Sequence, residues 1–281
     1  GDYKDVRFSR ADRSRHCYII GATGTGKSTL LYNMIRQDIE NGEGVAVIDP
    51  HGDLYQQVLE SIPRRRVDDV VLVDPSDFKH SVGINFLEYD ATNKPVQMNF
   101  ITNALLRPII GQPKSTINFR EIIDSGKIFL VNLSKGLLGQ SDTQLLGMLI
   151  IGKIFTAAMS RVKSRMERRR PMFLYVDEFQ NFTTDTVAYL LSEARKFGLY
   201  LTLANQNLAQ LSATSGRQNI LDAVLGNVGT TLIFRLGAVD AAKMDVYTRP
   251  ELQAQDLQEL PDFHAAGRLL VKNSPSRPFV F

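Results

Sequence analysis

The chain has 281 residues, of which 43% are hydrophobic and 22% charged, an ordinary globular composition that excludes a wholly disordered protein. Its formal net charge of +3 is too small to establish a nucleic-acid partner by itself. The single cysteine, Cys17, excludes an intramolecular disulfide framework, and the four scattered histidines make a zinc site unexpected. The longest apolar segment, 145–159, is interrupted by Lys153 and is shorter than a bilayer span, so we expect neither a membrane-spanning helix nor a signal peptide.

Short β-branched runs alternate with helical patterns along most of the chain, which is typical of an α/β protein with a parallel sheet covered by helices. We expect strands, in chain order, at 16–21, 44–49, 69–74, 127–133, 172–177, 199–205 and 230–236, with edge strands near 267–272 and 278–281. Helices are expected at 27–41, 54–61, 142–167, 184–197, 217–226 and 238–247. Residues 89–116 contain three prolines and no strand pattern, and are predicted to form a connection.

The helix expected at 184–197 can be tested by its periodicity. Val187, Leu190, Leu191, Ala194 and Phe197 share one stripe at 100° per residue, which indicates an amphipathic helix on a sheet. A glycine at 198 follows in the position that commonly ends a helix.

Residues 21–28 match the phosphate-binding P-loop pattern G-x-x-x-x-G-K-[ST] and lie between an apolar strand and an amphipathic helix. Glycines let successive backbone N–H groups turn toward phosphate oxygens, and the following helix adds its N-terminal partial positive charge. Lys27 is expected to reach the β- and γ-phosphates, and Ser28 to ligate Mg²⁺. The residues expected to bind the nucleotide are Gly21, Thr23, Gly24, Thr25, Gly26, Lys27, Ser28 and Thr29.

Hydrolysis also needs a carboxylate for Mg²⁺ and a group that orients the attacking water. Three expected strands end in aspartate, at Asp49, Asp74 and Asp177, and only the third continues with a second carboxylate, Glu178. We therefore expect Asp177 to hold Mg²⁺ and Glu178 to act as the water-polarising base. Asp49 and Asp74 are interpreted as structural strand ends, although the turn at 49–53 is expected to abut the nucleotide site.

Two further polar residues carry alternative interpretations. Gln206 follows an apolar strand and is either a γ-phosphate sensor or a strand-capping amide. Arg195 borders the surface of its expected helix, where with Lys196 it could complement the helix C-terminus. Alternatively, Arg195 is an arginine finger for a neighbouring subunit, although the residues alone favour the first interpretation.

Four ordered motifs, at 15–29, 47–54, 175–182 and 203–207, resemble those of the HerA/FtsK superfamily of P-loop ATPases. Within it, the chain is most similar to the TraG/TraD-like coupling proteins of type IV secretion and conjugation, over about 13–272. The resemblance implies a RecA-like core with a mostly parallel central sheet flanked by helices, formed by residues 1–281 as a single nucleotide-binding domain. It also implies ATP and Mg²⁺ as cofactors, and a homo-oligomeric ring, usually a hexamer, that moves DNA.

By motif, Lys27, Ser28, Asp177 and Glu178 keep the roles given above, and Gln206 matches the sensor glutamine of the family. The family's trans-acting arginine matches Arg195, which favours the finger interpretation, with Arg235 as the reserve candidate. Secretion-channel and relaxosome proteins are the further partners that the resemblance implies.

The sequence departs from the family pattern in two respects. Coupling proteins usually begin with transmembrane helices, which are absent here, so we expect a cytoplasmic location, at the inner membrane face where partners or an N-terminal anchor provide it. The family also carries an all-helical domain where this chain has only the short connection 89–116. We expect that domain to have been lost, removed or left out of the structure, with the junction near 97–103.

DNA binding is not established by the residues alone. The densest basic run, 161–170, has six cations and one acid, and Arg64–Arg66 form a second cluster. Such runs can neutralise DNA phosphates in a sequence-independent way, but a solvated, cationic helix end is the commoner explanation.

Three functions from different classes therefore remain. The first is a ring ATPase that couples hydrolysis to DNA movement in conjugation or related export. The second is a HerA/FtsK-like motor for DNA processing or segregation. The third is a nucleotide-switched binding module. The adjacent Asp177 and Glu178 disfavour it, because such a carboxylate pair is typical of sites that hydrolyse the nucleotide.

Overall fold

The computed structural model describes residues 8–77, 82–85, 114–183, 190–212, 220–272 and 274–281. Most of the expected connection at 89–116, including the junction near 97–103, lies outside the described residues, as does Val187 of the expected helical stripe.

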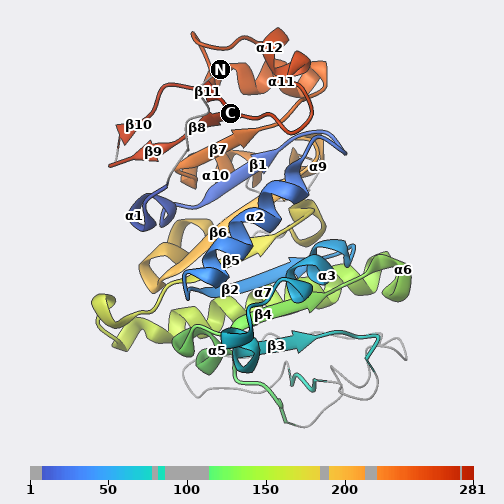
Figure 1. Cartoon of the computed structure of the whole chain (residues 1–281), viewed down its shortest axis with the longest axis vertical. Helices are drawn as coiled ribbons and strands as arrows, with labels where there is room; N and C mark the ends of the chain where they lie inside the picture. The colour runs from blue at the N-terminus through green and yellow to red at the C-terminus, as the bar shows by residue number, and fades with distance from the viewer. Residues whose placement is uncertain (1–7, 78–81, 86–113, 184–189, 213–219, 273) are drawn as a thin grey trace.

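The described strands form a large mixed sheet in the order β11-β8-β7-β1-β6-β5-β2-β4-β3 (Figure 1). Strands β1 to β7 run parallel, and β8 and β11 add antiparallel pairs at one edge. This arrangement confirms the predicted α/β class with a mostly parallel sheet. The strands are β1 Cys17–Ile20, β2 Gly44–Asp49, β3 Val70–Val73, β4 Ile128–Asn132, β5 Met172–Val176, β6 Leu199–Asn205, β7 Thr230–Ile233, β8 Ala266–Arg268 and β11 Phe279–Val280, with β9 Leu270–Val271 and β10 Ser274–Pro275 in a separate pair.

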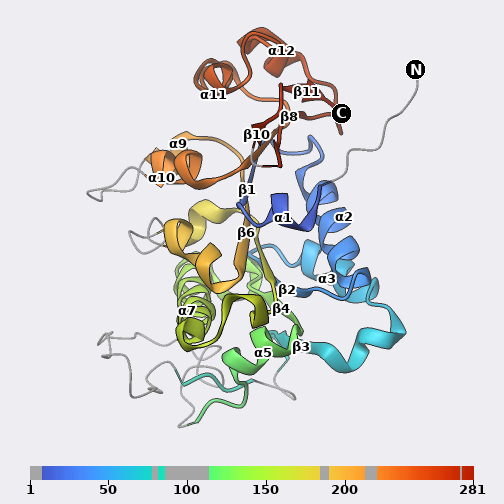
Figure 2. The ribbon, with the colours of Figure 1, turned by 90° about the vertical axis from the view of Figure 1, so that its left-hand side faces the viewer.

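Helices cover both faces of the sheet, with α2 and α3 on one side and α7 on the other (Figure 2). The α-helices are α1 Arg10–Arg13, α2 Lys27–Glu40, α3 Asp53–Glu60, α5 Phe119–Ser125, α6 Lys135–Leu138, α7 Gln140–Met159, α9 Ala209–Ser212, α10 Ile220–Asn227, α11 Ala238–Met244 and α12 Ala254–Glu259. Shorter 3-10 turns are η1 Arg64–Asp69, η2 Ser160–Lys163, η3 Met166–Arg168, η4 Phe179–Phe182, η5 Ala194–Phe197 and η6 Asp245–Tyr247. The sequence did not indicate α1, α5, α6, α9 or α12, which are all short.

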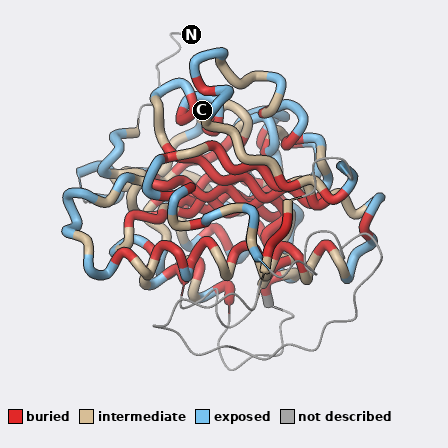
Figure 3. Tube along the Cα trace, turned by 90° about the horizontal axis from the view of Figure 1, so that it is seen from below, coloured by how far each residue is buried: buried red, intermediate tan, exposed pale blue. Residues whose placement is uncertain are grey.

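Each central strand is buried on both faces, as Figure 3 shows for the sheet seen from below. In β1, Cys17 and Ile19 pack in the core on the α2 side, and Tyr18 and Ile20 pack in the core on the α7 side. Burial on both faces explains why these strands are continuous apolar runs rather than alternating ones. The sheet is thus a rigid platform whose carboxyl edge carries the loops described below.

The helix expected at 142–167 is shorter than predicted, because α7 ends at Met159 and the chain continues as 3-10 turns. At its end the Ser160 hydroxyl donates a hydrogen bond to the Ala157 carbonyl (2.7 Å). The next residue, Arg161, is fully buried and reaches Asp124 and the Phe197 carbonyl instead of continuing a solvated helix face.

The stretch Gln140–Lys163 also corrects the expectation of a segment too short to span a bilayer. Together α7 and η2 make 24 residues with a mean hydropathy of 1.6, which is long and apolar enough to cross a membrane by length and composition alone. A buried core helix passes the same test, and 56% of the apolar window is buried inside the protein. Its apolar residues include Ile150 and Ile154, which pack in the core beneath the sheet.

The segment before β6 confirms the described part of the helix expected at 184–197. Residues 190–193 are helical, η5 follows, and Gly198 ends the turn with a left-handed φ of 73°. Leu190, Leu191 and Ala194 are buried, as their shared stripe predicted.

His16, just before β1, ties this segment to the sheet. Its Nε2 donates a hydrogen bond to the Leu191 carbonyl (3.1 Å), and its Nδ1 accepts one from the Leu201 amide (2.9 Å). Burial, together with the nearby Arg195 cation, lowers the pKa of the His16 imidazole to about 4. The imidazole is therefore neutral in the folded protein at pH 7.

We predict that His16 makes the protein less stable as the pH falls. The unfolded chain binds a proton near pH 6.5 but the folded chain only near pH 4, so the free energy of unfolding decreases as the pH falls through that window, by up to about 3 kcal/mol. His16→Gln should remove this part of the pH dependence. Urea unfolding of both proteins at pH 7.5 and pH 5 measures it, and identical pH slopes would contradict the assignment.

Candidate nucleotide-binding site

The sheet topology brings the predicted site residues to one edge. Strand β1 pairs with β6, which pairs with β5, all three parallel, so their carboxyl ends are neighbours. The P-loop follows β1, Asp177 and Glu178 follow β5, and Gln206 follows β6. The structure thus places the phosphate loop, the carboxylate pair and the glutamine together.

The P-loop closes over the N-terminus of α2 with a backbone that needs its glycines. Gly24 and Gly26 have φ values of 79° and 115°, in the left-handed region that other residues avoid. The Lys27 ammonium is buried and donates hydrogen bonds to the carbonyls of Gly21 (2.6 Å) and Ala22 (3.0 Å). Four predicted contact residues lie exposed at the rim of the loop, where phosphate can reach them: Thr23, Gly24, Ser28 and Thr29.

Glu178 is held in an uncommon conformation beside this loop. It is 7% exposed and has φ 46° and ψ 47°, a left-handed geometry for a non-glycine residue. The Gln206 side-chain amide donates a hydrogen bond to Glu178 Oε1 (2.7 Å), and the Gln180 amide donates one to Oε2. Both carboxylate oxygens therefore have a fixed partner, as expected of a group that must point in one direction.

The electrostatics of the carboxylate pair are set by burial. Burial, together with the neighbouring carboxylates of Glu178 and Asp49, raises the pKa of Asp177 to about 6. The amide of Glu178 donates to Asp177 Oδ1 (2.9 Å), and the Lys27 ammonium also opposes the rise. The pKa of Lys27 is in turn lowered by burial and raised by the two carboxylates.

Asp177 and Ser28 are suited to bind a magnesium ion whose coordination shell is completed by phosphate. Mg²⁺ is usually held by one or two carboxylates together with substrate phosphates and waters. The described residues contain no group of three or more His, Cys, Asp or Glu side chains arranged to hold a metal alone. Asp177, a buried carboxylate beside two others, would be relieved of repulsion by a cation, and Ser28 lies at the first turn of α2.

Asp49 and Asp74 have structural partners, in agreement with their interpretation from sequence. Asp49 accepts hydrogen bonds from the amides of His51 (2.8 Å) and Tyr55 (2.9 Å), which fixes the turn into α3. The Asp74 carboxylate accepts from the Ser76 amide (2.9 Å). Asp49 nevertheless lies close enough to raise the pKa of Asp177, so the turn at 49–53 does abut the site.

Arg195 is not part of this edge. It lies in η5, before β6, whereas Gln206 follows the same strand, and the seven residues of β6 alone span about 20 Å. Arg195 is exposed and cannot reach the P-loop of its own chain. Arg235 lies beside the P-loop, where its carbonyl accepts from the Ala22 amide (2.9 Å) and its guanidinium binds Asp262 (2.6 Å).

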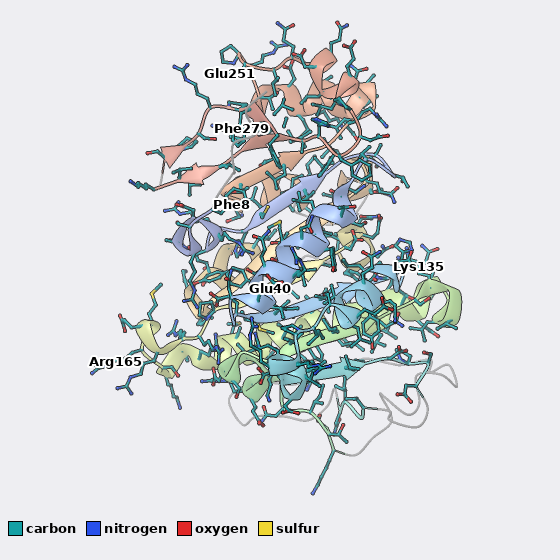
Figure 4. The ribbon with its side chains drawn as sticks, viewed as in Figure 1. Phe8, Glu40, Lys135, Arg165, Glu251 and Phe279 are labelled. Carbon is teal, nitrogen blue, oxygen red and sulfur yellow. The ribbon has the colours of Figure 1, made fainter. Side chains whose placement is uncertain are left out.

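The basic run 161–170 divides into structural and free cations. Arg161, Arg169 and Arg170 donate to backbone carbonyls. Within the described part of the chain, Lys163, Arg165 and Arg168 form no ion pair, and they line a cavity of about 670 Å³. Figure 4 places Arg165 at the opposite end of the strands from Lys135, which donates to Asn181 at the nucleotide edge (3.1 Å). In the second cluster, Arg66 is buried and bonds the carbonyls of Ile39, Glu43 and Gly126.

Sequence reasoning missed two contacts of the site. Gln180 was not singled out, although its position two residues after Glu178 is the available signal. The loop before β8 was also missed, where the Phe263 amide donates to the Thr25 carbonyl (2.8 Å). No sequence signal could have found that contact, since the two residues are 238 positions apart in the chain.

Comparison with known proteins identifies relatives of this arrangement. Residues 9–248 match the family model described as helicase HerA, central domain. The bacterial conjugative coupling protein TrwBdeltaN70 superposes with a TM-score of 0.73 at 15% identity, covering 95% of this chain and 84% of that chain. TrwB solved with ADP and Mg²⁺ gives 0.73 at 16% identity, covering 96% and 86%.

A more distant structure is the genome packaging NTPase B204 from Sulfolobus turreted icosahedral virus 2 in complex with ATP-gammaS. It superposes with a TM-score of 0.51 at 13% identity and covers 94% of this chain and 97% of that chain. At such identities the similarity shows the shared fold, which is that of RecA-like P-loop NTPases. No curated protein matched the chain significantly.

Proposed function

The chain belongs to the helicase HerA central-domain family, and on that premise we propose that it is an ATP-hydrolysing motor that moves DNA. The observation that carries the proposal is the meeting of P-loop, Asp177 and a doubly hydrogen-bonded Glu178 at one sheet edge. A loop that binds phosphate, a carboxylate that binds the metal and a second carboxylate that orients water are what hydrolysis requires, whereas nucleotide binding alone does not need all three.

Each residue has a distinct task in the proposed reaction. Lys27 leaves its two carbonyl partners to neutralise the β- and γ-phosphates, while Ser28 and Asp177 hold Mg²⁺, which offsets phosphate charge when bound. Glu178 accepts the proton of the attacking water. Gln206 follows β6 and donates a hydrogen bond to Glu178, so it can act as the sensor that links the presence of the γ-phosphate to the rest of the sheet edge.

We further propose that the active form is a homo-oligomeric ring, with six subunits as the family resemblance implies. Arg195 is exposed at the sheet edge away from its own P-loop, so only a neighbouring subunit could use it as a finger. DNA is the proposed cargo, with Lys163, Arg165 and Arg168 as candidate contacts to its phosphates. TrwB is named a plasmid coupling protein, and we propose a similar role in conjugation or type IV secretion, with channel and relaxosome proteins as partners.

The overall test is ATP turnover measured across protein concentration, with and without single-stranded and duplex DNA. A ring motor predicts turnover per subunit that rises with concentration and with DNA, and a DNA stimulation that weakens in Arg165→Ala/Arg168→Ala. Concentration-independent, DNA-indifferent turnover would instead favour a monomeric nucleotide switch.

Glu178→Gln should still bind ATP but hydrolyse it at least about 100-fold more slowly, because the amide cannot accept the proton of water. Equilibrium binding of a fluorescent ATP analogue and steady-state phosphate release measure the two properties. Glu259→Gln, an exposed change in α12, is the matched control and should behave as wild type. Undiminished phosphate release from Glu178→Gln would remove Glu178 from the reaction.

Arg195→Ala should lose about 1,000-fold or more of the turnover if it serves a neighbour. Mixed with wild-type protein in equal amounts, it should reduce total turnover below the half expected of independent subunits. Lys196→Ala, the adjacent exposed cation that pairs with Glu193, is the control. If Arg195→Ala retains turnover, Arg235 becomes the candidate or no arginine acts.

A further inference from the structure

The side chain of Phe263 lies beside the P-loop without being buried. A Cβ atom added at Gly26 would come within 3.0 Å of Phe263 Cδ1 and 3.2 Å of Phe234 Cε1, so the two rings flank that glycine. Phe234 is 3% exposed and belongs to the core, whereas Phe263 is 67% exposed. Packing therefore explains the first ring and leaves most of the second in contact with water.

The backbone of Phe263 is in a conformation that disfavours an aromatic residue. Its φ is 62°, in the left-handed region where a glycine is accommodated without cost. A bulky side chain persists in such a position only when its surroundings hold it there, and such positions concentrate at functional sites. Exposure and strain together indicate that this ring serves something other than the stability of the free chain.

The surrounding loop is firmly docked. Besides the bond from the Phe263 amide to Thr25, the Arg235 guanidinium binds Asp262 (2.6 Å) and the Leu260 carbonyl (3.3 Å). The Ala265 amide and carbonyl pair with the C-terminal Phe281, each at 3.0 Å. The ring is thus presented at a fixed place on the loop before β8.

The order of the strands determines which part of a nucleotide would meet this ring. Strand β1 lies between β6, on the side of Glu178 and Gln206, and β7, which pairs with β8. A triphosphate in the P-loop with its γ-phosphate toward Glu178 extends its other end toward the β7–β8 side. Phe263, directly before β8 and against Gly26, lies on that side.

We propose that Phe263 is the stacking platform for the purine base of the nucleotide, an assignment that rests on the proposed ATP binding. Stacking on an aromatic face needs no particular hydrogen-bonding edge, because every base has a π-face. The polar residues on either side of it in the chain are engaged: Asp262 binds Arg235, and the His264 ring nitrogen Nδ1 contacts the Asp262 carbonyl (3.0 Å). The site therefore selects for a base by its ring area and discriminates weakly between adenine and guanine.

The test compares two ligands that share the diphosphate, ADP and inorganic pyrophosphate, each titrated by calorimetry with Mg²⁺ present. Phe263→Ala and Phe263→Gly should each weaken ADP binding about tenfold and leave pyrophosphate binding unchanged, while Phe263→Trp should retain ADP binding. GDP should lose affinity by the same factor as ADP. Met166→Ala removes a similarly exposed apolar side chain at the other end of the strands and should leave the affinities for ADP and pyrophosphate unchanged.

Thermal unfolding separates a binding role from a structural one. Phe263→Gly relieves the positive φ, so its melting temperature without nucleotide should not fall below that of the wild type, although its ADP affinity falls. Unchanged ADP affinity in both the alanine and glycine variants would overturn the proposal. Equal losses for ADP and pyrophosphate would overturn it too, because the ring would then act on the P-loop itself.

Two other results separate this proposal from its premise and from a rival occupant. If the wild-type protein binds neither ADP nor pyrophosphate, the proposed ATP binding itself is contradicted. Sedimentation that shows altered assembly of Phe263→Ala, with normal ADP affinity, would assign the ring to a subunit contact and overturn the base platform.

Discussion

The structure depends on a balance of buried charge at one edge of the sheet. Lys27, Asp177 and Glu178 are each less than a tenth exposed, and in the free chain the ammonium is satisfied by two backbone carbonyls. Burial raises the pKa of Asp177 and lowers the pKa of Lys27, because it disfavours the charged form of each group. A ligand of opposite charge would stabilise that charged form. A phosphate with its cation would supply both charges at once, which is why nucleotide and metal binding belong together in this site.

The glycine positions and the strained residues have a common explanation in this arrangement. Gly26 leaves room between Phe234 and Phe263, and the left-handed Glu178 turns its carboxylate back toward the amides of Gln180 and Gln206. The glycine adopts its left-handed backbone without cost, whereas that of Glu178 costs stability locally. The parallel sheet, buried on both faces, provides the rigidity that maintains them.

The core of the site was predictable because its chemistry is written in short, local stretches. The P-loop at 21–28 and the Asp177–Glu178 pair each follow an apolar strand, and parallel strands bring their carboxyl ends to one edge, so two local patterns implied a three-dimensional meeting. What failed depended on distant contacts. The helix expected to continue to residue 167 ends earlier, where Arg161 turns inward and binds Asp124. The hydrogen bond between Phe263 and Thr25 joins segments that are far apart in the sequence. Propensity and spacing carry no information on either.

The position of Arg195 at one end of β6 and of Gln206 at the other has a geometrical consequence for assembly. If one subunit lends its arginine to the next, the contact joins unlike surfaces, as in a head-to-tail chain. Such a heterologous contact generates a ring where the rotation between successive subunits closes, and an open filament where it does not. It repeats in a single rotational sense until the circle closes, so every subunit is at once a donor and a recipient, and a lone chain holds halves of two different catalytic centres.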